Sequence, residues 1–427
     1  MSSLTPYFDH LFAFPMSVRY WSKQGLGLHP KDRAGQAADL RAAERILVLR
    51  LDEIGDLVLM TPFLRELRRS APRAWITLVV NPGTRNLVEF CPYVNEVLVF
   101  DVRFKGRLSR IRRRGRAFAF ARMHLWRRRF DLTIVPRWGA DYFEATLLAY
   151  YSGADSRVAY SERLHEVKAR LNRGYDRLLT QALEGAGPKH QVEWNLDVLQ
   201  PLRGNITDRR LELWLTGDDR EFAGKELAAQ GIRDGEVLMA LAPGSRAMKR
   251  CWPIERWVEL GRRLNQEYET RLVVIGSQSE SDLGACLEKA LGSAAINLVG
   301  RATLRQSSAI LERCSLTVSN DSGPMHLAAA AGSAVVEISC HPRGGDPSHE
   351  NSPSQFHPWG VPYIALQPDP AIFPCSDSCN SEVPHCILGI DVETVQQAVR
   401  EIFSTACASG PKNAKAQTPI SRGLFPC

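Results

Sequence analysis

The chain has 427 residues, of which 44% are hydrophobic and 24% are charged. These values are ordinary for a globular protein and exclude a fibrous or largely disordered chain, and the length is sufficient for two domains with extensions. No run approaches the roughly 20 apolar residues of a membrane-spanning helix, and the N-terminus lacks the apolar core of a signal peptide. We therefore expect a cytoplasmic protein whose ten cysteines are mostly reduced.

The first part of the chain alternates short apolar runs with helical patterns. Residues 1–40 show no clear period, and we interpret them as an N-terminal extension. The pattern then predicts strands at 46–51, 75–80, 96–100 and 132–135, with helices after the first strand, at 87–90 and at about 106–129. This repeated strand–helix order indicates a parallel sheet with helices on both faces.

A polar, irregular stretch at about 160–215 separates this series from a second one. The second series predicts strands at 237–241, 271–275, 316–319 and 334–338, with helices from about 254, at 280–291 and at 324–331. The fold class is therefore α/β with two doubly wound, Rossmann-like domains, at 41–215 and 216–404, followed by a disordered tail at 405–427. Because open parallel sheets bind ligands beyond the carboxyl ends of their strands, the two domains are expected to face a cleft.

The first candidate site residue is Asp56, which follows the first strand at the start of a helix. Its carboxylate can cap that helix. It also lies at the sheet edge where a reacting hydroxyl would be placed. Position alone leaves both interpretations open.

The second domain begins with a small-residue loop after its first strand. Gly244 and Ser245 are followed by Lys249, and backbone N–H groups beside a cation can hold a phosphate. The alternative is a surface turn with solvated cations. Glu280, after the next strand, can accept hydrogen bonds from ribose hydroxyls, although an acidic residue in a first helical turn also stabilises the helix dipole.

The segment from Asp321 to His326 carries the strongest pattern. A strand runs into Asp321, Ser322 and Gly323, and Pro324 suits the first turn of the helix that follows. The amides of Ser322 and Gly323 would point at an anion, and His326 can face the same place. Four such residues at one strand–helix junction favour a binding site over a structural role.

A basic segment runs from Arg103 to Arg129 and holds twelve of the cations behind the net charge of +7, with no acidic residue. It indicates an anionic partner, because uncompensated charge destabilises a segment unless an anion is near. Interleaved apolar residues suggest that parts of it lie at a membrane interface: Phe104, Phe118, Phe120, Leu125 and Trp126. The alternative is a solvated helix face.

Near the C-terminus, Cys375, Cys379, His385 and Cys386 fall within twelve residues. Three thiolates and an imidazole are suitable zinc ligands, but the spacing is not a pair of C-x-x-C knuckles, and the adjacency of His385 and Cys386 makes joint ligation awkward. A local disulfide and plain packing are the alternatives.

Taken together, these segments resemble glycosyltransferase family nine, the ADP-heptose:lipopolysaccharide heptosyltransferases. The family's Arg-Leu-x-x-Ile-Gly-Asp opening is similar to residues 50–56, and its Asp-Thr-Gly-Pro-x-His-x-Ala-Ala element is similar to residues 321–329. Its Lys-x-Trp-Pro element is matched loosely, because one extra residue lies between Lys249 and Trp252, and Ser322 stands where threonine is usual. The 160–215 region has no matching motif.

The resemblance implies a GT-B fold and a metal-independent inverting transferase without cofactor. Asp56 would be the general base, and Lys249 with the Ser322 and Gly323 amides would stabilise the leaving diphosphate. Glu280 would bind ribose, while Asp321 and His326 would hold the donor sugar or phosphates.

The resemblance also assigns partners. The 216–404 domain would bind a nucleotide-sugar donor, with ADP-heptose expected. The 41–215 domain would bind an anionic, lipid-linked lipopolysaccharide glycan as acceptor, at the inner face of the cytoplasmic membrane. The alternatives are an epimerase of the same architecture and a non-catalytic relative that binds anions or nucleic acid. No nucleic-acid module is recognisable, so no nucleic acid is expected.

Overall fold

The structure, a computed structural model, describes residues 38–101, 109–185, 187–233 and 236–408. Most of the expected N-terminal extension and the end of the expected tail lie outside the described residues. Within them, no helix is both long and apolar enough to span a membrane.

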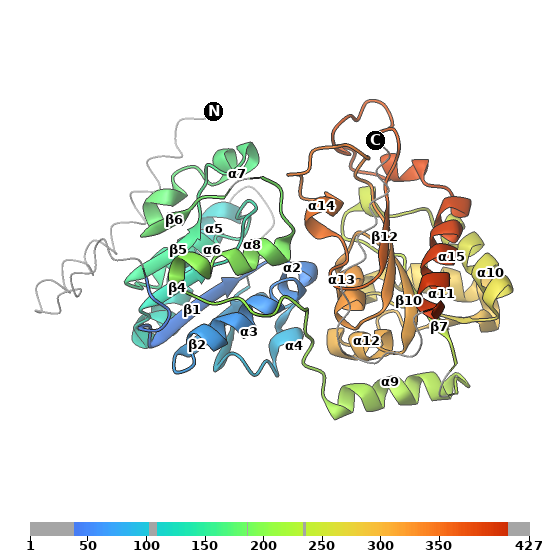
Figure 1. Ribbon diagram of the computed structural model, residues 1–427, viewed down its shortest axis with the longest axis horizontal. Coiled ribbons are helices and arrows are strands. Elements are labelled where there is room, and N and C mark those ends of the chain that lie inside the picture. Colours follow the sequence, from blue (N-terminus) through green and yellow to red (C-terminus); the bar gives the residue numbers. More distant parts are fainter. Residues whose placement is uncertain (1–37, 102–108, 186, 234–235, 409–427) are drawn as a thin grey trace, which may run out of the picture.

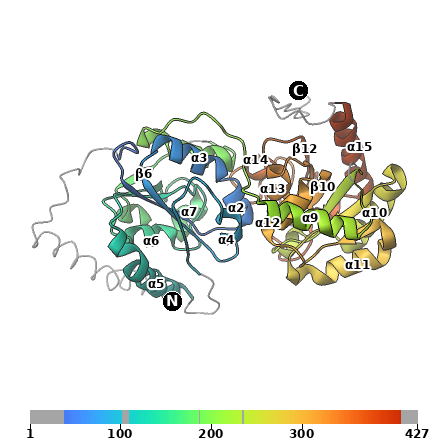
Figure 2. The ribbon, with the colours of Figure 1, turned by 90° about the horizontal axis from the view of Figure 1, so that it is seen from below.

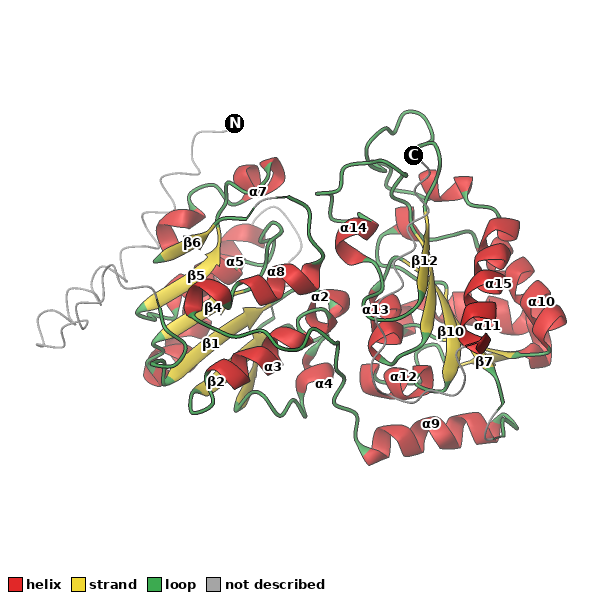
Figure 3. Ribbon diagram, viewed as in Figure 1, coloured by secondary structure: helices red, strands yellow, loops and turns green. Residues whose placement is uncertain are grey.

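Two six-stranded sheets, one in each half of the chain, form the framework (Figures 1 and 3). Their orders are β3-β2-β1-β4-β5-β6 and β12-β11-β10-β7-β8-β9, so each sheet has the same order when its strands are counted from its own first strand. Every pair is parallel. The strands are β1 (Arg45–Arg50), β2 (Trp75–Val80), β3 (Glu96–Val99), β4 (Leu132–Val135), β5 (Ser156–Tyr160), β6 (Gln181–Leu183), β7 (Leu238–Ala242), β8 (Arg271–Val274), β9 (Ala295–Asn297), β10 (Cys314–Asn320), β11 (Ala334–Ile338) and β12 (Tyr363–Leu366).

Helices cover both faces of each sheet. In the N-terminal domain they are α2 (Ile54–Val58), α3 (Thr61–Ser70), α4 (Arg85–Val88), α5 (Ser109–Phe120), α6 (Ala145–Tyr151), α7 (Glu166–Leu171) and α8 (Gln191–Asp197). In the C-terminal domain they are α9 (Gly217–Ala229), α10 (Ile254–Tyr268), α11 (Ser281–Leu291), α12 (Leu304–Leu311), α13 (Gly323–Ala330), α14 (Pro353–Phe356) and α15 (Val392–Ala408). Short π- or 3₁₀-helical turns are η1 (Ala121–Leu125), η2 (Trp126–Arg128), η3 (Tyr175–Leu178), η4 (Gln200–Leu202), η5 (Met248–Arg250), η6 (Gln278–Glu280), η7 (Gly292–Ala294) and η8 (Cys386–Gly389).

Alternation along β1 explains the two covered faces. Ile46 and Val48 pack into an apolar cluster with α3, whereas Leu47 and Leu49 pack into another with α5 and α6. Successive strand side chains point to opposite faces, so a continuous apolar run is buried on both sides. The sequence prediction of a doubly wound α/β fold is confirmed.

The C-terminal sheet is built in the same way. Met239 and Leu241 of β7 pack with α10 and α15, while Leu238 and Ala240 share a cluster with α12 and α13. This second cluster also includes residues of the first sheet, so the apolar core is continuous between the domains. Figure 2 shows α9 running along α12 beside the domain boundary.

The prediction of an irregular stretch at 160–215 is wrong in part. It contains α7, β6 and α8, and Trp194 of α8 is one of the largest fully buried side chains. These elements have three to seven residues, too few for a recognisable periodicity. At the other end, α15 extends to Ala408, past the expected boundary at 404, and Leu40 is buried rather than part of a loose extension.

Candidate active site

The predicted site residues lie at the switch points of the two sheets. Strand order reverses between β1 and β4 in the first sheet and between β7 and β10 in the second. Asp56 follows β1, Gly244 follows β7 and Asp321 follows β10. Such switch points, at the carboxyl ends of parallel strands, are where open α/β sheets bind ligands.

The two switch points face each other through α2 and α13, which are in contact across the domain boundary (Figure 1). A Cβ atom on Gly55 would overlap the His326 ring, and a Cβ on Gly323 would lie 3.0 Å from the Ile54 Cβ. Glycine is therefore needed at position 55 for this close approach, whereas a side chain at position 323 would require Ile54 to shift by a few tenths of an ångström. The two motifs, far apart in sequence, therefore lie together in one candidate site.

Asp56 is the third residue of α2, and its carboxylate caps the start of that helix, as one of the two interpretations of the sequence expected. Glu53 occupies the N-cap position, and its N–H donates to the Asp56 Oδ2 at 3.3 Å, in a capping box. Asp56 Oδ1 pairs with the Arg50 Nη2 at 3.2 Å. The Asp56 side chain remains 18% exposed, so its carboxylate is accessible to a small group in the site.

A buried network of arginines and carboxylates surrounds Asp56. Asp52 forms ion pairs with the Arg50 Nε at 3.0 Å and with the Arg137 Nη1 at 2.5 Å, and Arg137 lies 3.9 Å from Asp56. Burial opposes the charge of Arg137, but Asp52 and Asp56 together raise its pKa above the ordinary value. The sequence analysis missed Arg137, although its place just after β4 marks the other side of the same switch point.

On the opposite side, three polar atoms of the Asp321–His326 segment are buried without a hydrogen-bond partner among the described residues: Asp321 Oδ2, Ser322 Oγ and His326 Nδ1. Ser322 is the N-cap of α13, yet its side chain makes no capping hydrogen bond. Burying an unpaired polar group is costly. Several such atoms in six residues therefore indicate a ligand that satisfies them.

Charge states on this side follow from burial. Burial, with repulsion from Arg250, lowers the pKa of His326 to about 3, so the ring is neutral at pH 7. Burial also raises the pKa of Asp321, against the attraction of the Arg250 guanidinium. A neutral imidazole can donate or accept one hydrogen bond at each ring nitrogen.

Of the two neighbouring cations, Arg250 is the one that contacts the motif. Its Nη1 lies 3.4 Å from the Asp321 Oδ2, and its Nη2 donates to Asn351. The Lys249 Nζ instead donates to the Cys379 carbonyl at 2.9 Å. Arg250 also has the spacing to Trp252-Pro253 of the family's Lys-x-Trp-Pro element, whereas Lys249 lies one residue too far.

Glu280 and Gly244 lie against each other. The Glu280 Oε2 accepts from the Ser277 N–H and Oγ at 2.6 and 2.9 Å, and a Cβ on Gly244 would overlap the Oε1. Ser245 is beside them, with its carbonyl 3.5 Å from the Cys251 thiol. Glu280 thus completes a capping box and also lies at the β7 switch point, so both functions proposed from the sequence fit its position.

The basic segment differs from its expectation. In the described part, Phe120 and Leu125 are buried, and Phe118 packs edge-on against Trp126 and Tyr151. These side chains therefore face the domain core rather than a membrane; Phe104 lies outside the described residues. Two of the cations pair with carboxylates of other elements, Arg114 with Glu144 at 3.7 Å and Arg128 with Glu96.

Comparisons with known proteins agree with this geometry. Residues 124–338 match glycosyltransferase family 9 (heptosyltransferase). Lipopolysaccharide heptosyltransferase 3 of Escherichia coli (strain K12) is 24% identical over 291 residues, which cover 66% of this chain and 79% of the relative.

Two solved structures share the fold. The family 9 glycosyl transferase of Veillonella parvula DSM 2008 aligns with a TM-score of 0.68 at 22% identity, over 86% of this chain and 98% of that one. E. coli ADP-heptose lps heptosyltransferase II aligns with a TM-score of 0.60 at 19% identity, over 84% and 99%. The two facing Rossmann-like domains are thus a GT-B architecture, and the chain belongs to glycosyltransferase family 9 and is a glycosyltransferase.

Proposed function

We propose that this glycosyltransferase moves a heptosyl group from ADP-heptose to a hydroxyl of a lipopolysaccharide core or related glycan. The observation that carries the proposal is the juxtaposition of Asp56, at the β1 switch point, with buried atoms of Asp321, Ser322 and His326 that lack a hydrogen-bond partner among the described residues. The names of the relatives support the choice of heptose and of a lipopolysaccharide acceptor.

Asp56 is the general base of the proposed reaction. Its carboxylate takes the proton of the acceptor hydroxyl while that oxygen bonds to the anomeric carbon. The bond from the anomeric carbon to the diphosphate oxygen breaks on the opposite face, and its electron pair leaves with the diphosphate. Configuration is inverted, and the network of Arg50, Asp52 and Arg137 fixes the direction of the carboxylate.

The leaving diphosphate gains negative charge as the bond breaks. We assign the guanidinium of Arg250 to it, together with the Ser322 hydroxyl and the amides of Ser322 and Gly323 at the N-terminus of α13. Lys249 lies one residue away and adds positive charge. Preorganised donors of this kind stabilise charge that develops in the transition state.

The other predicted donor-binding residues take supporting parts. Glu280 would bind the ribose hydroxyls above Gly244 and Ser245, where only a glycine leaves room for the carboxylate. Asp321 and His326 would bind the sugar or phosphates through the buried atoms that lack a hydrogen-bond partner among the described residues. No metal or other cofactor takes part in this proposed chemistry.

The acceptor is proposed to be anionic and lipid-linked, and the enzyme to work at the cytoplasmic face of a membrane. Exposed cations of the basic segment support this part of the proposal: Arg112, Arg122, Arg127 and Arg129. Basic side chains near an anionic surface each contribute about 1 kcal/mol.

Replacement of the base tests the reaction. In Asp56→Asn, the side-chain shape is kept and proton acceptance is lost, so transfer should fall roughly 10²–10⁴-fold while ADP binding by calorimetry persists. Asp155→Asn, an exposed carboxylate of the same domain, should transfer normally. Near-normal turnover in Asp56→Asn would contradict the assignment.

A panel of sugar nucleotides tests the donor. ADP-heptose should give the highest kcat/KM with a truncated lipopolysaccharide acceptor, ahead of ADP-glucose, UDP-glucose and GDP-mannose. Preference for a uridine donor would overturn the heptose assignment and leave the transferase intact.

A further inference from the structure

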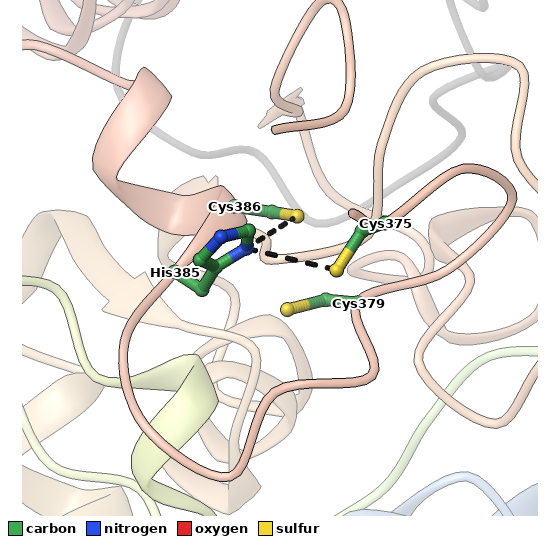
Figure 4. A group of neighbouring side chains, drawn as sticks. All are labelled: Cys375, Cys379, His385 and Cys386. Atoms are coloured by element: carbon green, nitrogen blue, oxygen red, sulfur yellow. Dashed lines mark hydrogen bonds between the residues drawn. The ribbon is translucent and has the colours of Figure 1, made fainter. Parts of the chain in front are cut away.

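The four residues Cys375, Cys379, His385 and Cys386 converge on one point (Figure 4). Their three sulfurs and one ring nitrogen all lie within 4.8 Å of one another. The thiols are free, and Cys379 and Cys386 are buried. The cluster is outside the residues assigned to the transfer reaction.

The distances match a tetrahedral ion. The His385 Nδ1 lies 3.5 Å from the Cys386 Sγ and 3.6 Å from the Cys375 Sγ. With zinc–sulfur bonds of about 2.3 Å and zinc–nitrogen bonds of about 2.05 Å, a regular tetrahedron separates nitrogen from sulfur by about 3.5–3.6 Å and sulfur from sulfur by about 3.8 Å. The observed ligand set therefore needs shifts of about 1 Å or less to hold Zn²⁺.

In the structure, the adjacency of His385 and Cys386 does not prevent both side chains from binding one ion. His385 adopts φ −141° and ψ −86° just before η8. This conformation brings its ring beside the thiol of the next residue, so both point to the same centre in Figure 4. A disulfide would join two of the sulfurs and would not account for the convergence of the third thiol and the imidazole.

The loop that carries most of these residues has no helix or strand to hold it in place. Residues 367–385 form a stretch without helix or strand between β12 and α15. Loops of this length in compact domains are uncommon unless they are functional or otherwise fixed. Phe373 on this loop is 90% exposed, and the apolar contacts of the loop with the core come from Ile372, Cys375 and Cys379. Cys375 and Cys379 lie within the loop, His385 is its last residue, and Cys386 begins η8.

We propose that Cys375, Cys379, His385 and Cys386 form a closed, four-coordinate structural Zn²⁺ site that fixes the loop between β12 and α15. The three cysteines bind as thiolates and the histidine through Nδ1, so loading releases the thiol protons to solvent and leaves a site of net charge −1. No coordination position is left for substrate. The ion takes no direct part in the proposed transfer chemistry.

The site also adjoins the proposed diphosphate-binding residues. The Cys379 carbonyl accepts the hydrogen bond from Lys249, and η5 packs against η8. Arg256, in the helix α10 that follows η5, donates to the Leu388 and Ile390 carbonyls at 2.8 and 2.6 Å. The metal therefore fixes the backbone on which Lys249 rests.

Metal analysis of the full-length protein tests the proposal. Protein purified without chelator from zinc-supplemented cells should contain about one zinc per chain by elemental analysis. Titration of the wild-type thiols with a mercurial, followed with a chromogenic chelator, should release that zinc. This second measurement does not depend on whether any variant folds.

Variants locate the ion. Cys375→Ser combined with Cys379→Ser should abolish zinc retention, whereas Cys286→Ser, which changes an exposed free thiol on α11, should retain it. Reconstitution of the metal-free wild type with Co²⁺ should give the intense visible absorption of a tetrahedral thiolate complex. No stoichiometric metal, stoichiometric iron in place of zinc, or unchanged zinc in the double variant would overturn the proposal.

Discussion

At the scale of single residues, two groups of the site have both a local and a proposed chemical function. Asp56 completes the capping box of α2, and Glu280 completes that of η6. A carboxylate that is fixed by the backbone of its own helix is already oriented before a ligand binds, which reduces the entropic cost of binding. Helix capping and the proposed chemistry thus both favour a carboxylate at positions 56 and 280.

Arg250 should contribute more to donor binding than Lys249. Arg250→Ala removes the guanidinium that lies beside Asp321, and loss of a charge-assisted hydrogen bond of about 1.5–3 kcal/mol should weaken ADP binding roughly 10–100-fold. Lys249→Ala should have a smaller effect. Calorimetric titration with ADP measures both.

Arg246→Ala is the matched control, because Arg246 is an exposed cation of the same loop that pairs with Glu53 of the other domain. It should change ADP affinity less than Arg250→Ala. If Lys249→Ala weakened ADP binding more than the other two variants, the diphosphate contact would be assigned to Lys249 instead.

His357 should make the free energy of unfolding sensitive to acid. Its ring stacks on His190 and Tyr363, and burial, with His326 nearby, lowers its pKa from 6.5 to about 4. The unfolded chain takes up a proton below pH 6.5 and the folded chain only near pH 4. The stabilisation is therefore complete above pH 6.5 and is lost as the pH falls toward 4.

The variant His357→Phe keeps the stacking and removes the titration. Between pH 7 and pH 5, it should lose about 2 kcal/mol less of its free energy of unfolding than the wild type, measured by urea denaturation. Asp321 and Glu337, whose pKa values are raised by burial, act in the opposite direction in both proteins and cancel in the comparison. Equal pH dependence would contradict the assignment.

At the scale of elements, the contact between α2 and α13 is one of the contacts that join the domains, and it lies at the candidate site. Gly55→Ala places a methyl group where the His326 ring lies, so the two helices must separate or the ring must move. Since small misplacements of reacting groups cost up to about 100-fold, kcat/KM should fall by a similar factor. Steady-state kinetics measure it, with Gly115→Ala, where an added Cβ meets nothing within 4 Å, as the control. Unchanged kcat/KM in Gly55→Ala would show that the helix contact is not required.

The loop between β12 and α15 should couple zinc to donor binding. If the zinc site fixes the Cys379 carbonyl that receives Lys249, chelation of the metal should raise the KM for the donor about as much as Lys249→Ala does. The two changes should not add, because both remove one interaction. Additive effects on KM would show that the metal and Lys249 act independently on donor binding. That result would leave the zinc site itself intact, because zinc content is measured separately.

At the scale of the whole molecule, the exposed cations of the N-terminal domain form the surface that we propose contacts an anionic membrane. Changing Arg112, Arg122 and Arg127 of the N-terminal domain to Glu should weaken flotation with phosphatidylglycerol vesicles about 100-fold or more, and added salt should weaken wild-type binding. The matched control changes Arg233, Arg262 and Lys289, exposed cations of the C-terminal domain, to Glu. Equal loss in the two triple variants would show that net charge, not this surface, governs membrane binding.

The sequence alone determined the fold class and most of the segments that carry the site. Buried parallel strands are continuous apolar runs, so β1, β2, β4 and β11 were found with little error in their bounds. The positions of Asp56, Gly244, Glu280 and Asp321 beyond strand ends were also predicted, because the position after a strand is a local property of the chain. The short elements β6 and α8 were missed because three to seven residues do not establish a period.

The tertiary structure decided which side chains meet. Arg137 joined Asp56 because β4 pairs with β1, and Arg250 rather than Lys249 reached Asp321 because a three-residue turn set their directions. The packing of Gly55 on His326, and the convergence of three cysteines with His385, likewise depend on contacts between distant segments. Periodicity and spacing describe neighbours along the chain, whereas strand pairing and domain packing determine neighbours in space.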